Sequence, residues 1–160
     1  MFEDITGVFG YKLGEEIDPY YFAKAETIKG NNVIAFKPKN KPEYQKLIEF
    51  GNRTWNHYFW AVTPKTRKIA GIYYNAFHSS IYICKKRLES KIVPALEKKY
   101  GEFTEYDVDG KGKGFEIWKG HRSVYVMCEK RADERNARFI LGFEYDDLLK
   151  LQAREIANLE

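Results

Sequence analysis

Two cysteines and three histidines are the side chains in this chain of 160 residues that most readily do chemistry. Cys84 lies where a strand-like run gives way to a helical one, and Cys128 lies in the strand-like segment Ser123 to Glu129. A bridge between them would close a loop of about 45 residues and stabilise the fold by roughly 4 kcal/mol. If they stay reduced, they are two ordinary buried thiols. The sequence leaves both interpretations open, although two isolated cysteines lack the paired spacing of a zinc site.

The histidines His57, His78 and His121 form no recognisable catalytic or metal-binding pattern. In a hairpin turning at residues 64–67, position 57 pairs near positions 74 and 75, so the first two histidines do not meet. The serines lack the context of a nucleophile elbow. The glycine-rich segment Gly110–Gly114 lacks the spacing and the following Ser or Thr of a phosphate-binding loop. We therefore predict no catalytic, metal-binding or cofactor-binding residues.

An aromatic cluster at residues 55–60 points instead to a binding role. In a strand, alternate side chains of this cluster face opposite ways. A single sheet with helices on one face buries only one of the two sets, and an exposed aromatic patch usually marks an interaction site. The alternative is that loops or the N-terminal arm cover that face. The predicted partner-binding residues are Trp55, His57, Tyr58 and Trp60.

Basic side chains gather in the C-terminal half of a chain whose net charge is +4. A nucleic-acid surface combines such charge with aromatic side chains on which bases stack. Acidic residues such as Glu116 and Glu129 are interleaved, which favours a solvated charged face over a nucleic-acid surface. The residues of this candidate basic surface are Lys111, Lys113, Lys119, Arg122, Lys130, Arg131, Arg135 and Arg138.

The elements that must position these side chains follow from hydrophobic period and turn residues. From about Ser80 to Tyr100 the apolar residues recur at nearly four, which predicts a helix that Pro94 kinks and Gly101 ends. Phe139–Tyr145 alternates as a half-buried strand does. The other predicted elements are an N-terminal arm or strand at 7–15, a strand at 33–37, helical turns at 43–50, hairpins at 58–77 and 115–130, a loop at 108–114, and a helix from Asp146 or Asp147 to about Leu159.

This order of strands, helix, strands and helix predicts an α+β fold. We expect an antiparallel sheet with one long kinked helix and a C-terminal helix packed on one face. A single domain should span residues 1–160, because no repeat and no linker divides the chain.

No run of about 18 apolar residues occurs, so the sequence predicts no membrane span. Phe2-Glu3-Asp4 after Met1 is not the basic and then apolar start of a signal peptide. The chain is therefore expected to be cytoplasmic, or else the mature form of a periplasmic or secreted protein with Met1 added.

Several landmarks together resemble small exported bacterial proteins over most of the chain. They are the start Gly7–Glu15, the turn Thr63–Thr66 before Ile69–Tyr73, Cys84 ahead of Leu96–Gly101, and Cys128 in a late strand before Tyr145–Leu149. The resemblance implies an exported protein with a disulfide, and it implies no reaction.

The function that these observations favour is a small non-enzymatic domain that binds another protein, as inhibitor or immunity proteins of the bacterial envelope do. A cytosolic nucleic-acid-binding domain that uses residues 111–138 is the alternative. A hydrolase is third, and it would need His57 or His121 to meet a carboxylate such as Asp107 or Asp109.

Overall fold

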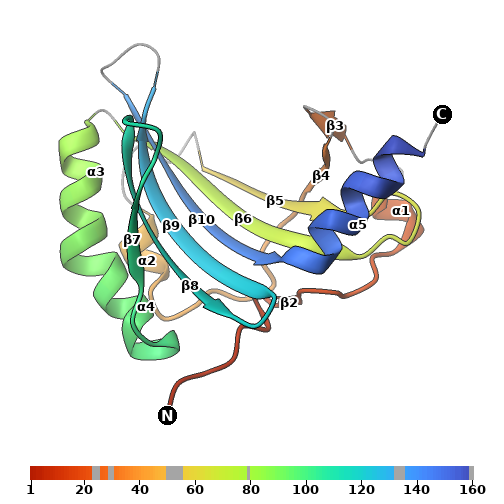
Figure 1. Ribbon diagram of the computed structural model, residues 1–160, viewed down its shortest axis with the longest axis horizontal. Helices are drawn as coiled ribbons and strands as arrows, with labels where there is room; N and C mark the ends of the chain where they lie inside the picture. Colours follow the sequence, from red (N-terminus) through yellow and green to blue (C-terminus); the bar gives the residue numbers. More distant parts are fainter. Residues whose placement is uncertain (23–25, 29–30, 50–55, 79, 132–135, 159–160) are drawn as a thin grey trace.

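An antiparallel sheet of eight strands forms the centre of the protein, and helices pack against it (Figure 1). The computed structural model describes residues 1–22, 26–28, 31–49, 56–78, 80–131 and 136–158. The strand order is β3-β4-β5-β6-β10-β9-β8-β7. The bounds are Glu26–Ile28 (β3), Asn31–Ala35 (β4), His57–Val62 (β5), Ile69–His78 (β6), Thr104–Asp107 (β7), Gly112–Lys119 (β8), Arg122–Lys130 (β9) and Ala137–Tyr145 (β10).

The helices confirm the predicted α+β class with a long helix and a C-terminal helix. The long helical segment runs from Ile81 to Tyr100 and contacts β9 and β10, while the C-terminal helix contacts β6, β4 and β10. A small hairpin of β1 (Gly7–Val8) and β2 (Tyr11–Lys12) lies in the N-terminal arm. The helices are α1 (Pro19–Phe22), α2 (Gln45–Ile48), α3 (Ile81–Arg87), the π-helical turn η2 (Leu88–Ile92), α4 (Val93–Tyr100) and α5 (Asp146–Ala157).

Pro94 disturbs the long helix as expected, and the disturbance takes the form of a π-helical turn. Proline has no N–H to donate and crowds the carbonyl four residues before it. Immediately before Pro94 the helix widens over η2, where the N–H of Val93 bonds to the carbonyl of Leu88. Such a turn absorbs a disruption without ending the helix. At the start, Ser80 caps the helix by accepting a hydrogen bond from the N–H of Ile83.

One face of the sheet is covered by the long helix, α2 and the N-terminal arm, and we call it the helix-covered face. Alternate residues of β6, β9 and β10, such as Tyr74, Val126 and Phe139, join the hydrophobic core there. The long helix buries three side chains completely on this face: Leu88, Ile92 and Leu96. The arm adds Phe9 and Ile5, which are only 1% and 2% exposed. The intervening strand residues point to the opposite side, which we call the second face.

Cys84 and Cys128 form a disulfide, with Cα atoms 5.9 Å apart. Cys84 lies on the first turn of α3 and Cys128 on β9, and both side chains are fully buried on the helix-covered face. The bridge joins the helix covalently to the middle of the sheet. Of the two interpretations that the sequence left open, the structure therefore supports the bonded one.

The prediction of a loop from Val108 to Gly114 was wrong for its last residues. Gly112 and Gly114 instead lie in β8, which starts two residues before Gly114 and pairs with both β7 and β9. A Cβ on Gly112 would lie 1.9 Å from the carbonyl oxygen of Cys128. These glycines therefore permit close approach of neighbouring strands and rings, rather than a flexible connection.

Two polar side chains fix α5 to the sheet. The amide of Gln152 donates to the carbonyls of Asn32 and Val62, at 3.2 and 3.0 Å. The carboxylate of Glu155 accepts hydrogen bonds from the N–H groups of Lys65 and Thr66 in the β5–β6 turn, at 2.6 and 3.1 Å. Burial acts to raise the pKa of Glu155, but these donors lower it below its usual value. No helix in the described part of the chain is long and apolar enough to cross a membrane.

Candidate functional site

The prediction of an exposed aromatic surface does not hold for Tyr58 and Trp60, because both side chains face the core. Trp60 is only 4% exposed, and Tyr58 is half-buried against the same core. Two segments cover them: the ring of Tyr11 in the N-terminal arm lies 4.8 Å from that of Trp60, and Phe36, directly after β4, stacks on Trp60 at 4.9 Å. The covered alternative therefore holds for this set. Trp55 lies outside the described residues, and His57 is exposed on the second face.

The basic residues of the second hairpin do not form one free patch. Lys113 is paired with Glu89 and Glu105, and Arg138 with Glu129 at 3.0 Å. Position 113 on β8 and position 138 on β10 lie far along their strands from the end of the sheet where the chain turns at Gly120. Arg135 lies outside the described residues.

At the turn end of the same hairpin, the basic side chains hold the N-terminal arm. Lys119 donates to the carbonyl of Glu3, and Arg122 donates to the carbonyl of Ile5 at 3.1 Å while its guanidinium lies 4.4 Å from the Tyr145 ring. At the opposite end, Arg131 lies over Phe77, and Lys111 and Lys130 are exposed. The positive charge is thus divided between two ends of the hairpin, and much of it has an intramolecular partner.

The histidines and carboxylates proposed for a hydrolase are not brought together. Asp107 accepts a hydrogen bond from the N–H of Gly110 in the β7–β8 turn, at the other end of β8 from His121. His121 lies 3.6 Å from Asp147 instead, and with Asp146 these side chains could share an ion. His121 and Asp147 are exposed, and Asp146 already pairs with Lys150 at 3.0 Å.

His78 is a different case, because it is buried at the end of β6. Burial, aided by the nearby Arg87 guanidinium, lowers its pKa to about 4. An imidazole with this pKa is neutral at physiological pH.

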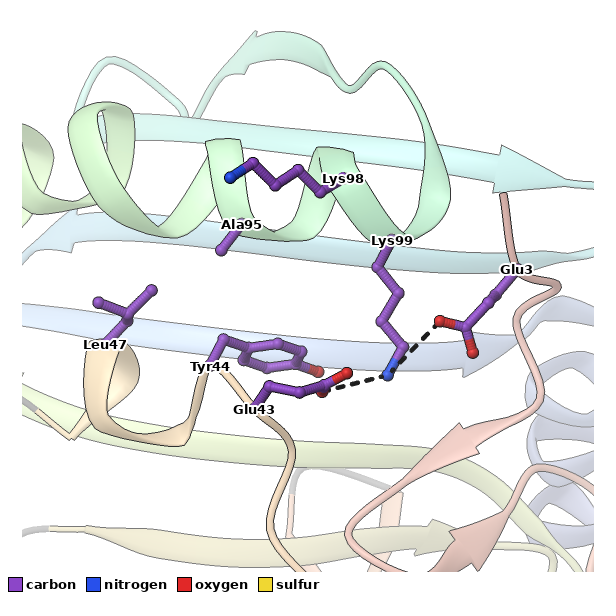
Figure 2. A pocket seen from close by; sticks show the side chains of 7 residues that line it. All are labelled: Glu3, Glu43, Tyr44, Leu47, Ala95, Lys98 and Lys99. Carbon is purple, nitrogen blue, oxygen red and sulfur yellow. Dashed lines mark ion pairs between the residues drawn. The ribbon is translucent and has the colours of Figure 1, made fainter. Parts of the chain in front are cut away.

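A pocket of about 380 Å³ lies between the N-terminal arm, α2 and the end of α4 (Figure 2). Lys99 reaches from α4 toward Glu3 and Glu43, and its ammonium lies 3.9 and 3.6 Å from their carboxylates. The N–H of Glu3 also donates to the carbonyl of Lys99 at 2.8 Å. The backbone N–H of Glu43 and the charge of Lys99 hold the pKa of the Glu43 carboxyl below its usual value.

We call this group the Lys99 pocket, and its charges compensate one another. One cation meets two carboxylates that come from segments far apart in the sequence. The arrangement fastens the N-terminal arm across the helix, and the lining carries no net formal charge, because Lys98 and Lys99 together balance Glu3 and Glu43. Tyr44 beneath it is 5% exposed, and burial holds its pKa well above the usual range, so it does not ionise at physiological pH.

The second face carries a carpet of aromatic side chains that sequence reasoning did not identify. The pairing register places these residues on β5, β6, β9 and β8, and on β7 at the edge, while β10 between β6 and β9 contributes Gly142 and Glu144 to the same face. Among the described residues, none of them belongs to the hydrophobic core of the helix-covered face. Trp118 is 50% exposed, and Tyr73 is 8% exposed. The set consists of Phe59, Tyr73, Phe77, Tyr106, Trp118 and Tyr125.

Three tyrosine rings of this carpet lie over glycines. A Cβ on Gly142 would lie 2.3 Å from Cε1 of Tyr125, and one on Gly114 would lie 2.2 Å from Cζ of Tyr106. On β6, a Cβ on Gly71 would similarly meet the hydroxyl of Tyr73 at 2.3 Å. The missing side chains give the rings room to lie close to the sheet, which makes the carpet flat and well packed. Phe59 extends it by stacking on Tyr73 at 5.0 Å.

Glu144 lies among these rings. The hydroxyl of Tyr73 donates to its Oε2 at 2.5 Å. Burial raises the pKa of Glu144, the Tyr73 hydrogen bond lowers it, and the neighbouring carboxylates Asp146 and Glu116 raise it further, with a net increase.

The tyrosines of the carpet are poor acids. Burial and the charge of Glu144 raise the pKa of Tyr73 and Tyr125 well above the usual range. Burial and the carboxylates Glu116 and Glu144 raise the pKa of Tyr106 to about 12. The tyrosines therefore stay protonated at neutral pH and serve as hydrogen-bond donors or flat contact surfaces, not as bases.

One signal in the sequence could have indicated this face. Tyr73, Asn75 and Phe77 alternate with the apolar Ile72, Tyr74 and Ala76 along the strand. What the sequence did not provide was the register that brings Tyr73 beside Glu144, which lies 71 positions later.

Comparisons with known proteins give no relative from which a role can be transferred. No protein-family model matches the chain, and neither the curated proteins nor the solved structures include a match.

Proposed function

We propose that this chain is a small non-enzymatic binding domain that recognises another protein through the aromatic carpet of its second face. The observation that carries this proposal is that tyrosine, tryptophan and phenylalanine side chains are laid flat on a sheet face outside the hydrophobic core. Tyrosine and tryptophan are the residue types enriched in binding hot spots, because they supply a large contact area at a low cost in conformational entropy.

The dimensions of the carpet favour a macromolecular partner. It extends from Phe59 on β5 across β6, β10 and β9 to Trp118 on β8. Four inter-strand steps of about 4.8 Å make a width of roughly 19 Å. A protein surface covers such a width, whereas a small ligand is usually enclosed in a concave pocket.

The disulfide supports an oxidising compartment for this role. Cys84 and Cys128 are bonded, and such bonds persist mainly outside the reducing cytosol. Together with the resemblance to small exported bacterial proteins, this supports an inhibitor-like or immunity-like protein of the bacterial envelope, in the periplasm or secreted.

Capture of a partner by surface variants tests the proposal. The chain would be cross-linked in an envelope fraction of the source organism, and captured proteins would be identified by mass spectrometry. We expect Trp118→Ala to lose a partner that the wild-type chain captures. Tyr82→Ala serves as the matched control, because Tyr82 is also exposed, at 70%, but lies on α3. Retention of the same partner by the Trp118 variant would exclude the second face as the contact surface.

A further inference from the structure

Glu144 is a largely buried carboxylate in the second face, and the described part of the chain places no cation beside it. Within the residues that the structure describes, no ion pair reaches Glu144, and its one strong contact is the neutral hydroxyl of Tyr73. Buried charges in proteins are normally paired with an opposite charge, because desolvation is otherwise costly.

The neighbouring carboxylates increase the excess of negative charge around Glu144. Glu116 lies across Tyr125 on the same face, and in the described part of the chain it too has no ion pair. Asp146 starts α5 two residues after Glu144 and is paired with Lys150. The nearest basic residue on the second face of β10 is Arg138, which is six positions from Glu144 and is paired with Glu129.

A third acceptor on the same face also lacks a donor. Oδ1 of Asn75 is buried and has no hydrogen-bond partner among the described residues. Asn75 lies on β6, two residues from Tyr73 and opposite His57. The second face therefore offers two uncompensated carboxylates and one unpaired amide oxygen among flat aromatic rings.

An arginine side chain matches this combination better than any other group that a protein partner carries. Its guanidinium is permanently charged, stacks on aromatic faces and presents five N–H donors in a fork that fits a carboxylate. It is also hydrated more weakly than a lysine ammonium, which lowers the cost of burying it. Aromatic rings attract such a cation through their negative faces.

We infer that the second face receives an arginine side chain of the partner protein, stacked on the tyrosine rings and paired with Glu144, with Glu116 as the neighbouring carboxylate. This inference rests on the proposed function, because it names the chemistry by which the same face recognises its partner. Charge complementarity is its basis: the basic group that Glu144 lacks among the described residues of its own chain comes from the bound protein.

Two short peptides test the inference directly. The probes are Ac-Gly-Arg-Gly-NH₂ and its citrulline counterpart, which has nearly the same shape without the charge. Binding to the ¹⁵N-labelled disulfide-bonded chain would be followed by NMR. We expect the arginine peptide to shift resonances of β6, β9 and β10 with a dissociation constant in the millimolar range, and the citrulline peptide to bind about tenfold more weakly.

A pair of variants locates the contact. Glu144→Gln keeps the shape and the acceptor for Tyr73 but removes the charge, so it should reduce arginine-peptide binding to the citrulline level. Glu105→Gln is the control: it makes the same change of charge on β7, but on the helix-covered face, where Glu105 pairs with Lys113. It should bind the arginine peptide as the wild-type chain does.

The outcomes separate this inference from the proposed function. Equal binding of the two peptides, or shifts confined to the helix-covered face, would overturn the arginine site whether or not the Glu144 variant folds. If Trp118→Ala loses its partner but the arginine peptide fails to bind, the protein-binding face stands and the arginine site falls. If the arginine peptide binds at Glu144 but Trp118→Ala keeps its partner, the cation site stands and the proposed protein contact falls.

Discussion

The Lys99 pocket and the second face both collect carboxylates, but they treat the charge in opposite ways. In the pocket, one ammonium lies between the carboxylates of Glu3 and Glu43 (Figure 2). On the second face, the described residues provide Glu144 with a tyrosine hydroxyl and no cation. A concave site with ionisable groups is therefore not by itself the better candidate for a binding site. A charge already neutralised holds the chain together, whereas an uncompensated charge is available for recognition.

The largest expected effect comes from the disulfide, which links the helix side of the molecule to the sheet. Replacing both cysteines, as in Cys84→Ala with Cys128→Ala, should lower the free energy of unfolding by about 4 kcal/mol, because the bridge closes a long loop of the unfolded chain. Urea denaturation of the variant and the oxidised wild type measures this difference. A change below about 1 kcal/mol would show that the bridge does not constrain the unfolded chain as expected.

The same variant should affect the two regions to different degrees. The Lys99 pocket has a wall on α4, which the bridge helps to hold, whereas the second face consists of paired strands. Hydrogen exchange should therefore accelerate more in the long helix than in β6 and β10. Equal acceleration in both would contradict this separation.

A smaller loss of stability is expected where the tyrosine rings lie over glycines. Gly142→Ala should destabilise the protein by roughly 1–3 kcal/mol, because the new methyl group would occupy the space of the Tyr125 ring. Thermal denaturation measures the loss. In combination with Tyr125→Ala the glycine substitution should cost much less, and strictly additive effects would show that the ring does not lie against Gly142.

Glu144→Gln should have the opposite effect on stability: it should raise the free energy of unfolding at neutral pH by on the order of 1 kcal/mol. Because the pKa of Glu144 is raised in the folded protein, folding binds this proton more tightly. The protonated carboxyl group of Glu144 therefore contributes to stability at low pH, and this contribution is lost as the pH rises through the folded-state pKa. The groups facing it, Tyr73, Tyr106, Tyr125, Glu116 and Asp146, supply no compensating cation.

Unfolding free energies measured from pH 3 to 8 give the comparison. The difference in stability between the Gln variant and the wild type should grow as the pH rises. A variant that is less stable than the wild type at pH 7 would contradict an uncompensated charge at this position.

The smallest effect is expected in the Lys99 pocket. Glu43→Gln should change the stability at neutral pH by less than about 0.5 kcal/mol, because the Glu43 side chain is 79% exposed and exposed ion pairs contribute little. Its lowered pKa gives the reverse pH dependence: the contribution is present above the usual pKa and is lost as the pH falls through the folded-state value. A loss above about 1 kcal/mol would mean that this pair does more than fasten the arm.

Local patterns predicted the fold well where the pattern had one explanation. The alternation in Phe139–Tyr145 indicated the strand β10, and the period from Ser80 to Tyr100 indicated the long helix. Pro94 correctly indicated a disturbance, although sequence alone did not distinguish a kink from a π-helical turn.

The errors arose where a residue type serves two purposes. Glycines in Gly112–Gly114 were interpreted as a loop, but they lie in β8 because rings and backbone approach them closely. Trp60 was a candidate partner-binding residue, because the sequence did not decide whether its face is exposed; in the structure Tyr11 and Phe36 cover it.

The candidate site was beyond sequence reasoning for a related physical reason. Tyr73, Tyr125 and Glu144 come from three different strands, and only the register of β6, β10 and β9 brings them together. A one-residue shift in that register would move each of them to the helix-covered face.

A pH titration of the folded protein by ¹³C NMR, following the carboxyl carbons of Glu144 and Glu43, tests the contrast between the two regions most directly. We expect Glu144 to titrate above the ordinary glutamate value of 4.5 and Glu43 to titrate below it. A midpoint for Glu144 at or below that of Glu43 would show that the second face compensates its charge internally, and it would contradict the account of this face as the site of recognition.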